Sequence, residues 1–128
     1  MAGVTYDTGA LIAAERNNRR MWALHVGFLA EEVVPTVPAP VLAEAWRGGS
    51  RQASLARLLA GCDVDPMSAD QARRVGELAG RARHDDIVDV TVAEGAIGRG
   101  DDVIVTSNEG HISRVVRAGG KRIRIGTI

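Results

Sequence analysis

The sequence has 128 residues and a mass of 13.6 kDa, which is room for one folded domain. Apolar residues make up 45% and charged residues 25%, close to the globular average, which excludes a disordered or fibrous chain. The 16 basic and 16 acidic side chains cancel. Overall charge therefore does not favour nucleic acid as a partner, and any phosphate binding must be local.

The cysteine content and the N-terminus bear on the compartment. Cys62 is the single cysteine, so the sequence holds neither a disulfide framework nor a thiolate metal cluster. The first residues lack the basic stretch and apolar run of a signal peptide, and no apolar run approaches the roughly 20 residues that span a bilayer. We therefore expect a cytoplasmic protein with no membrane partner.

The first half of the sequence alternates short β-branched runs with helical patterns. Residues 4–6 form a β-rich run, and helical spacing of apolar residues begins after Asp7 and Thr8. A second helix covers residues 21–32. Residues 33–37 are a candidate buried strand, although Pro35 cannot donate to a sheet and implies an edge or a strand end. Two further helices are predicted, over residues 40–46 and from a cap at Ser50 to about residue 60.

The second half continues this alternation. We predict a weak strand over 62–65, helices over 68–83 and 85–97, a clearly buried strand over 103–105, a short helix after Asn108, and a last strand over 122–125. Strands separated by helices are typical of a parallel sheet with helices on both faces. The sequence therefore predicts a single α/β domain over residues 1–128, a three-layer α/β/α sandwich with a mostly parallel central sheet.

Acidic residues near the ends of the predicted strands are the candidate functional residues. In an open α/β sheet, ligands bind beyond the carboxyl ends of the strands. Asp7 stands directly after the first strand, where it is also an ordinary helix N-cap. Glu44 is the single charged side chain of the predicted 40–46 helix, although that helix can simply expose one edge to water.

Asp89 is a third candidate. Asp85 and Asp86 suit the start of a helix, where they cap it and face the positive end of its dipole. Asp89 follows Asp86 by three residues, so the two carboxylates share a helix face and repel each other unless a cation lies between them. A solvated helix face is the alternative interpretation. Taken together, three carboxylates at one sheet edge indicate a site for a hard cation such as Mg²⁺ or Mn²⁺.

Four short motifs stand in the order and spacing of PIN-domain nucleases. They are YDTGALI (6–12), PVLAEAWRGG (40–49), DIVD (86–89) and VTSN (105–108). The sequence resembles in particular the VapC-type toxins of bacterial toxin–antitoxin modules, from residue 4 to about residue 125. This resemblance implies an α/β/α sandwich and a Mg²⁺- or Mn²⁺-dependent endoribonuclease. It also implies a homodimer that cleaves RNA and is neutralised by a VapB-type antitoxin.

The resemblance assigns the catalytic metal ligands to Asp7, Glu44 and Asp89. Asn108 stands where the family usually has a fourth acidic ligand, and His111 where it often has a further Asp. Asn108 and Asp86 are therefore further candidate ligands, and Glu109 is a candidate to replace the missing fourth acidic ligand.

Four other residues are candidates for binding the substrate. Thr8 and Ser107 can orient the ligands, and Arg47 and Arg51 can position a phosphate, since a guanidinium binds it through two donors. For the two arginines, plain surface positions are an equally good interpretation.

Two alternatives stay open at this point. A PIN fold that binds RNA or an antitoxin without cleaving is one, because Asn108 carries less charge than Asp. A receiver-like phosphoacceptor domain is the other, with Asp7, Thr106 and Lys121 after successive strands, although Asp65 is a poor match for its phosphorylated residue. The three histidines are expected to be structural or surface residues.

Overall fold

The computed structural model describes residues 3–128, and within them five short strands form one sheet in which each pairing is parallel. The strands are β1 (Val4–Tyr6), β2 (Thr36–Pro38), β3 (Asp63–Asp65), β4 (Val103–Thr106) and β5 (Arg124–Thr127). Their order across the sheet is β3-β2-β1-β4-β5. The helices are α1 (Thr8–Glu15), α2 (Arg19–Ala30), α3 (Ala39–Ala45), α4 (Ala53–Leu59), α5 (Ala69–Ala82), α6 (Ile87–Arg99) and α7 (Glu109–Ala118), with a short 3₁₀ turn, η1 (Ser50–Gln52), before α4.

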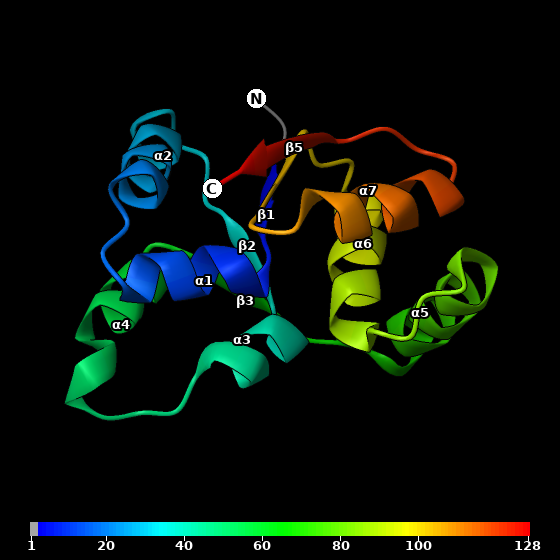
Figure 1. Ribbon diagram of the computed structural model, residues 1–128, viewed down its shortest axis with the longest axis horizontal. Coiled ribbons are helices and arrows are strands. Elements are labelled where there is room, and N and C mark those ends of the chain that lie inside the picture. The colour runs from blue at the N-terminus through cyan, green and yellow to red at the C-terminus, as the bar shows by residue number, and fades with distance from the viewer. Residues whose placement is uncertain (1–2) are drawn as a thin grey trace.

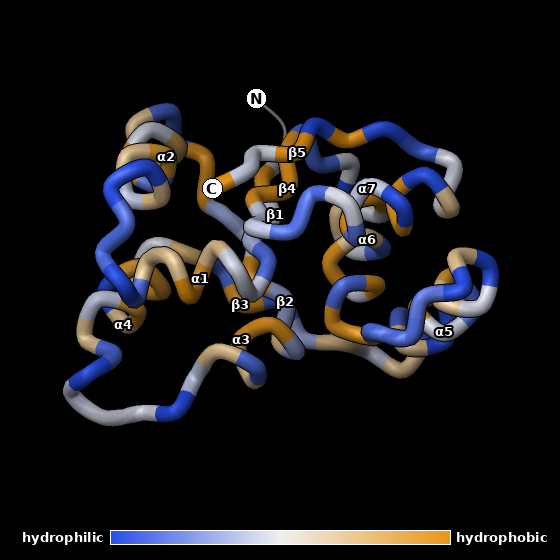
Figure 2. Tube along the Cα trace, in the orientation of Figure 1, coloured by the Kyte–Doolittle hydropathy of each residue, from blue (hydrophilic) through white to orange (hydrophobic). Residues whose placement is uncertain are grey.

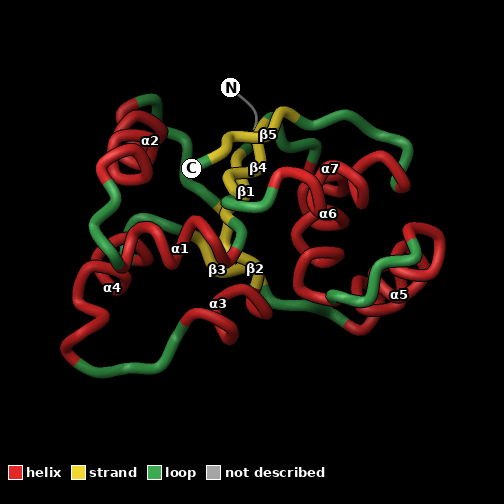
Figure 3. Tube along the Cα trace, viewed as in Figure 1, coloured by secondary structure: helices red, strands yellow, loops and turns green. Residues whose placement is uncertain are grey.

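The helices cover both faces of this sheet, as the sequence predicts. In Figure 1, α1, α2 and α4 lie to the left of the strands and α5, α6 and α7 to the right, while α3 lies below them. Figure 3 shows the strands as a narrow yellow layer between the two red groups. The three-layer α/β/α architecture and the parallel sheet are therefore confirmed. In the described residues, no helix has both the length and the apolar content needed to cross a membrane.

The neighbouring strands β1 and β4 lie within the hydrophobic core. Each residue of β1 and β4 is buried, whereas the outer strands β3 and β5 are partly exposed. Figure 2 shows hydrophobic segments along β4 and along part of helix α6. Strands buried on both faces are expected to be apolar throughout, which explains why residues 103–105 are the clearest strand signal in the sequence.

Several predicted boundaries shift for identifiable reasons. The expected strand over 33–37 begins instead at Thr36, directly after Pro35, so Pro35 marks a strand end as predicted. The prediction that Ser50 caps the following helix is wrong. The segment begins as a 3₁₀ turn after Gly49, whose positive φ of 89° redirects the chain, and Ser50 makes no capping hydrogen bond there.

The strand order decides between two predicted folds. Receiver domains are doubly wound sheets of order 2-1-3-4-5, which differs from the order observed here, so the receiver-like alternative is wrong. In the observed order, the chain moves outward from β1 through β2 to β3 and then crosses back to β4. The crevice that results lies at the carboxyl ends of β1 and β4, where an α/β sheet binds its ligands.

Arg99, the last residue of α6, links β1 and β3 with the residues that precede β4. Its Nη2 donates to Oγ1 of Thr5 at 2.7 Å, and its Nε donates to Oδ2 of Asp101 at 3.3 Å. Its Nη1 also pairs with Asp65 at 3.0 Å. Asp101 is buried and accepts a further hydrogen bond from the Thr5 hydroxyl. The buried charge of Asp101 therefore depends on Arg99 for its compensation.

Substituting Arg99→Ala should lower the free energy of unfolding by about 1 to 3 kcal/mol, because it leaves the buried Asp101 carboxylate without its cation. Arg73→Ala is the matched control, since Arg73 pairs with Asp70 on the exposed face of α5. That control should change stability by less than about 0.5 kcal/mol. Urea unfolding measures both, and equal losses in the two variants would show that the Arg99 contacts contribute nothing particular.

Candidate active site

Asp7 is the buried acidic residue at the crevice between β1 and β4. It ends β1 and caps α1, and only 4% of its surface is exposed. Its Oδ1 accepts from the Thr8 amide at 2.7 Å, and its Oδ2 accepts from the Thr106 hydroxyl at 2.7 Å. The capping role inferred from the sequence is therefore real. Each oxygen keeps a second lone pair that these two donors do not use.

The charge on Asp7 is unfavourable in this environment. Burial raises the pKa of Asp7 above its ordinary value, and the negative charges of Asp89 and Glu44 raise it further. The hydrogen bonds from Thr106 and Thr8 act in the opposite direction and lower it. The charges of Asp89 and Glu44 thus act on the Asp7 carboxyl, a repulsion that a cation would relieve, although the ligand atoms of these three residues do not all lie within 4.8 Å of one another.

Asp89 lies in the first turn of α6 and contacts two histidines. Its Oδ2 is 2.9 Å from Nε2 of His84 and 3.7 Å from Nδ1 of His111. Because α6 runs opposite to the strands, its first turn lies at the same sheet edge as Asp7. Candidate metal-ligand atoms of His84, Asp89 and His111 all lie within 4.8 Å of one another. The sequence thus predicts Asp89 at this edge, and the resemblance marks the position of His111, but nothing in the sequence predicts the contact with His84.

Glu44 reaches the site from α3 and is the most exposed of the three carboxylates. The helix that carries it is held by Gln52, a buried residue of η1. The Gln52 amide donates to the Ala45 carbonyl at 2.9 Å and accepts from the Arg47 and Gly48 amides at 2.8 Å each. This side chain closes the loop after α3 and so sets where that helix ends.

The two further candidate ligands both cap helices. Asn108 caps α7 and accepts weakly from the His111 amide, while its side-chain nitrogen lies 3.0 Å from Nδ1 of His111. Asp86 caps α6, with Oδ1 accepting from the amides of Val88 and Asp89 at 3.0 and 3.2 Å. The capping interpretation of Asp86 is confirmed, and one of its oxygens stays free of these bonds.

Thr8 and Ser107 border the crevice on opposite sides. Oγ1 of Thr8 is buried and has no hydrogen-bond partner among residues 3–128. Ser107 packs against Gly9, where an added Cβ would collide with the serine hydroxyl. Gly9 therefore permits the close approach of α1 to the loop after β4. The unpartnered Thr8 hydroxyl next to Asp7 is a position that a bound water would satisfy.

The two predicted phosphate-binding arginines lie near the end of α3. Arg47 turns back on its own helix, with Nη1 donating to the carbonyls of Trp46 at 2.8 Å and Ala43 at 3.3 Å. Arg51 is exposed in η1. Arg47 thus serves the helix end in this structure, which is the plain surface interpretation, whereas Arg51 is available to solvent.

The donor set fits a divalent cation. Carboxylate oxygens such as those of Asp7, Asp89 and Glu44 are the ligands that Mg²⁺ and Mn²⁺ prefer, and the repulsion that Asp89 and Glu44 exert on Asp7 favours a positive ion beside it. The orphaned Thr8 hydroxyl offers a contact to a water of that ion. Sequence reasoning misses the roles of His84 and Gln52, and it marks His111 only as standing where the resemblance implies a further Asp. The first two roles arise from long-range packing, and no local pattern in the sequence marks them.

Exchanging Asp7→Asn should alter how stability depends on pH in metal-free buffer. The raised pKa of Asp7 in the folded state means that the folded protein loses stability as pH rises from 3.8 through that raised value. An asparagine side chain carries no charge, so the variant should gain stability relative to the native protein over this interval. Urea unfolding at several pH values measures the difference.

Asp70→Asn, on the exposed face of α5, is the control for this pH series. Its curve should run parallel to that of the native protein. A parallel curve for Asp7→Asn as well would show that ionised Asp7 is not disfavoured by the fold.

The comparisons with known proteins agree with this architecture. The structure resembles that of VapBC2 from Rickettsia felis, solved bound to a DNA fragment from its promoter, with a TM-score of 0.74, 18% identity and coverage of 98% of each chain. It also resembles Mycobacterium tuberculosis VapC20, a Sarcin-Ricin loop cleaving toxin, with a TM-score of 0.61, 17% identity and coverage of 85% of this chain and 92% of that one. No curated protein sequence matches this chain. The sequence profile of the PIN domain matches residues 4–118, and the protein therefore belongs to the PIN domain family.

Proposed function

We propose that this protein is a Mg²⁺- or Mn²⁺-dependent endoribonuclease and the toxin of a toxin–antitoxin module. The observation that carries the proposal is the buried Asp7 carboxylate, which lies at the crevice of a PIN fold together with the charges of Asp89 and Glu44. Such a site suits phosphodiester hydrolysis, where negative charge builds up on the reacting phosphate.

Each of these residues has a role in the proposed reaction. Asp7, Asp89 and Glu44 would hold the cation, with Asn108 and Asp86 at its border. When bound, the ion lowers the pKa of an attacking water and offsets charge on the phosphate. Thr8 and Ser107 would orient groups around the carboxylates, and the exposed Arg51 would position the substrate phosphate. Arg47 would join it only by giving up its bonds to the carbonyls of Ala43 and Trp46.

The structural relatives support the substrate class and the partner. VapC20 is a Sarcin-Ricin loop cleaving toxin, and VapBC2 was solved bound to a DNA fragment from its promoter. We infer RNA as the substrate and a VapB-type antitoxin as the inhibitor. We also infer a homodimer, supported by the exposed Val26 and Leu29 on α2. The surplus of apolar residues in the predicted helices over residues 21–32 and 50–60 also leads us to expect both at such a surface, but α4 buries Leu55 and Leu58 and leaves no large apolar side chain exposed.

Substituting Asp7→Asn, Asp89→Asn or Glu44→Gln should each reduce the cleavage of RNA by at least about 100-fold, since each removes a charge that holds the catalytic ion. Asp70→Asn is the matched control and should cleave normally. The assay follows RNA products on a gel at several Mg²⁺ and Mn²⁺ concentrations. If the native protein binds RNA or antitoxin but cleaves nothing under any of these conditions, the non-cleaving PIN alternative replaces the proposal.

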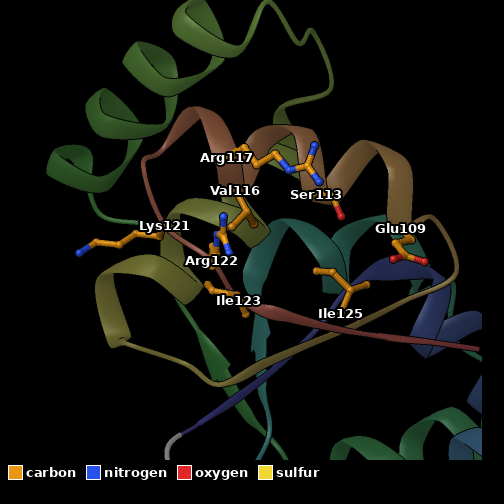
Figure 4. A pocket seen from close by; sticks show the side chains of 8 residues that line it. All are labelled: Glu109, Ser113, Val116, Arg117, Lys121, Arg122, Ile123 and Ile125. Carbon is orange, nitrogen blue, oxygen red and sulfur yellow. The ribbon is translucent and has the colours of Figure 1, made fainter.

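A cationic groove next to the site offers a path for the RNA backbone. Figure 4 shows this groove, a cavity of about 470 Å³ along α7 and the segment before β5. It begins at Glu109, the neighbour of Asn108, and ends at Lys121. Its lining residues are Glu109, Ser113, Val116, Arg117, Lys121, Arg122, Ile123 and Ile125. Three cations against one carboxylate make the groove locally positive in a chain of zero net charge, so we propose that it binds the phosphates of the substrate.

Reversing charge in the groove should weaken RNA binding. Arg122→Glu should raise the Kd of an RNA fragment and reduce the slope of log K against log salt by about 0.7 for each phosphate that the variant no longer binds. Arg19→Glu, an exposed arginine at the start of α2, has the same charge change and should have little effect. Fluorescence anisotropy measures both variants, and equal weakening by the two would show that only overall charge matters.

A further inference from the structure

Two histidines and Asp89 form a second group of possible metal ligands beside the carboxylate site. His84 comes from the loop between α5 and α6, Asp89 from the first turn of α6, and His111 from the first turn of α7. The side chains of His84 and Asp89 are 10% and 13% exposed, whereas that of His111 is 61% exposed. Three separate segments thus bring nitrogen and oxygen donors to one point, which is open to solvent on the His111 side.

The distances in this group match those around a small cation. With metal–ligand bonds of about 2.0 to 2.2 Å, neighbouring donor atoms of a tetrahedral ion are about 3.3 to 3.6 Å apart. Oδ2 of Asp89 lies 2.9 Å from Nε2 of His84 and 3.7 Å from Nδ1 of His111, on either side of that range. All three donors lie within 4.8 Å of one another. An ion can therefore contact the three of them with small side-chain adjustments.

The protonation of His111 also suits a ligand. The side-chain nitrogen of Asn108 lies 3.0 Å from Nδ1 of His111, and since an amide nitrogen only donates, Nδ1 is the acceptor. The single lone pair of Nδ1 therefore points at the Asn108 amide, and a cation bound at this nitrogen would replace that hydrogen bond. Until then, Asn108 holds this ring in place.

The chemistry of the donors selects the kind of ion. Mg²⁺ prefers oxygen ligands, whereas imidazole nitrogen suits Zn²⁺, Cu²⁺ and other late transition metals. We propose that His84, Asp89 and His111 form a binding site for Zn²⁺, with the exposed side near His111 left for water or a further ligand. The site rests on the proposed function in one respect, because Asp89 also belongs to the carboxylate set around Asp7.

Binding of Zn²⁺ alone, without RNA, tests this site. Metal-free native protein titrated in a calorimeter should bind one equivalent of Zn²⁺ at least about 100-fold more tightly than Mg²⁺. His84→Gln and His111→Gln keep the side-chain volume roughly and lose the imidazole. Each should weaken Zn²⁺ binding by at least about 100-fold, more than the 10- to 100-fold typical of losing a group that only supports a ligand. Asp70→Asn is the control and should bind Zn²⁺ as the native protein does.

A spectroscopic probe separates ligation from simple ion pairing between His84 and Asp89. Co²⁺ in place of Zn²⁺ should give the visible absorption bands of a nitrogen-liganded ion. These bands should shift in the His111→Gln variant. Because His111 is exposed, this variant should keep the native fold, which circular dichroism checks. Unchanged Zn²⁺ affinity and Co²⁺ bands in both histidine variants would overturn the site.

The two proposals fail in different ways. If Zn²⁺ does not bind but Mg²⁺ supports cleavage of RNA, the zinc site is wrong and the nuclease stands. If Zn²⁺ binds as expected and RNA stays uncut with every cation, the nuclease is wrong and the zinc site stands.

Discussion

The parallel pairing of β1 with β4 is the constraint on which the rest of this structure depends. Residues Val4 to Tyr6 align with Val103 to Val105, so the two strands end side by side. Asp7 follows one strand directly, and Thr106 ends the other, which explains the hydrogen bond between them. Because each helix returns the chain to the opposite edge, the first turn of α6 arrives at this same edge and delivers Asp89. The alignment of the buried strands β1 and β4 thus determines where Asp7 and Asp89 lie.

The fold disfavours the ionised form of Asp7, the buried carboxylate at this edge. Burial and two neighbouring negative charges disfavour the ionised form of Asp7, while the hydroxyl of Thr106 and the amide of Thr8 support it. Groups that repel one another in the absence of a ligand are common at functional sites, because a fold has no other reason to keep them together. The two histidines differ, because their nitrogens attract the Asp89 carboxylate, and the side chain of His111 is also 61% exposed to solvent.

The sequence predicts the sheet and its acidic edge well because both follow from local rules. Apolar β-branched runs mark β1 and β4, and the position of Asp7 after a strand already indicates its role as a cap. What could not be predicted depends on packing between distant segments. His84 and His111 are 27 residues apart in the sequence numbering and meet only because α7 packs beside α6. Gln52 carries no local pattern, and its importance arises from four separate partners converging on a loop, so it could not be identified beforehand.

Helix α6 links two ends of the molecule with different physical character. Asp89 stands in its first turn and Arg99 at its end, about 15 Å further along the axis at 1.5 Å per residue. The Arg99 end compensates a buried charge through Thr5 and Asp101, whereas the Asp89 end gathers charges that repel. The carboxylate end of α6 can therefore be altered without removing the contacts that Arg99 makes at its other end.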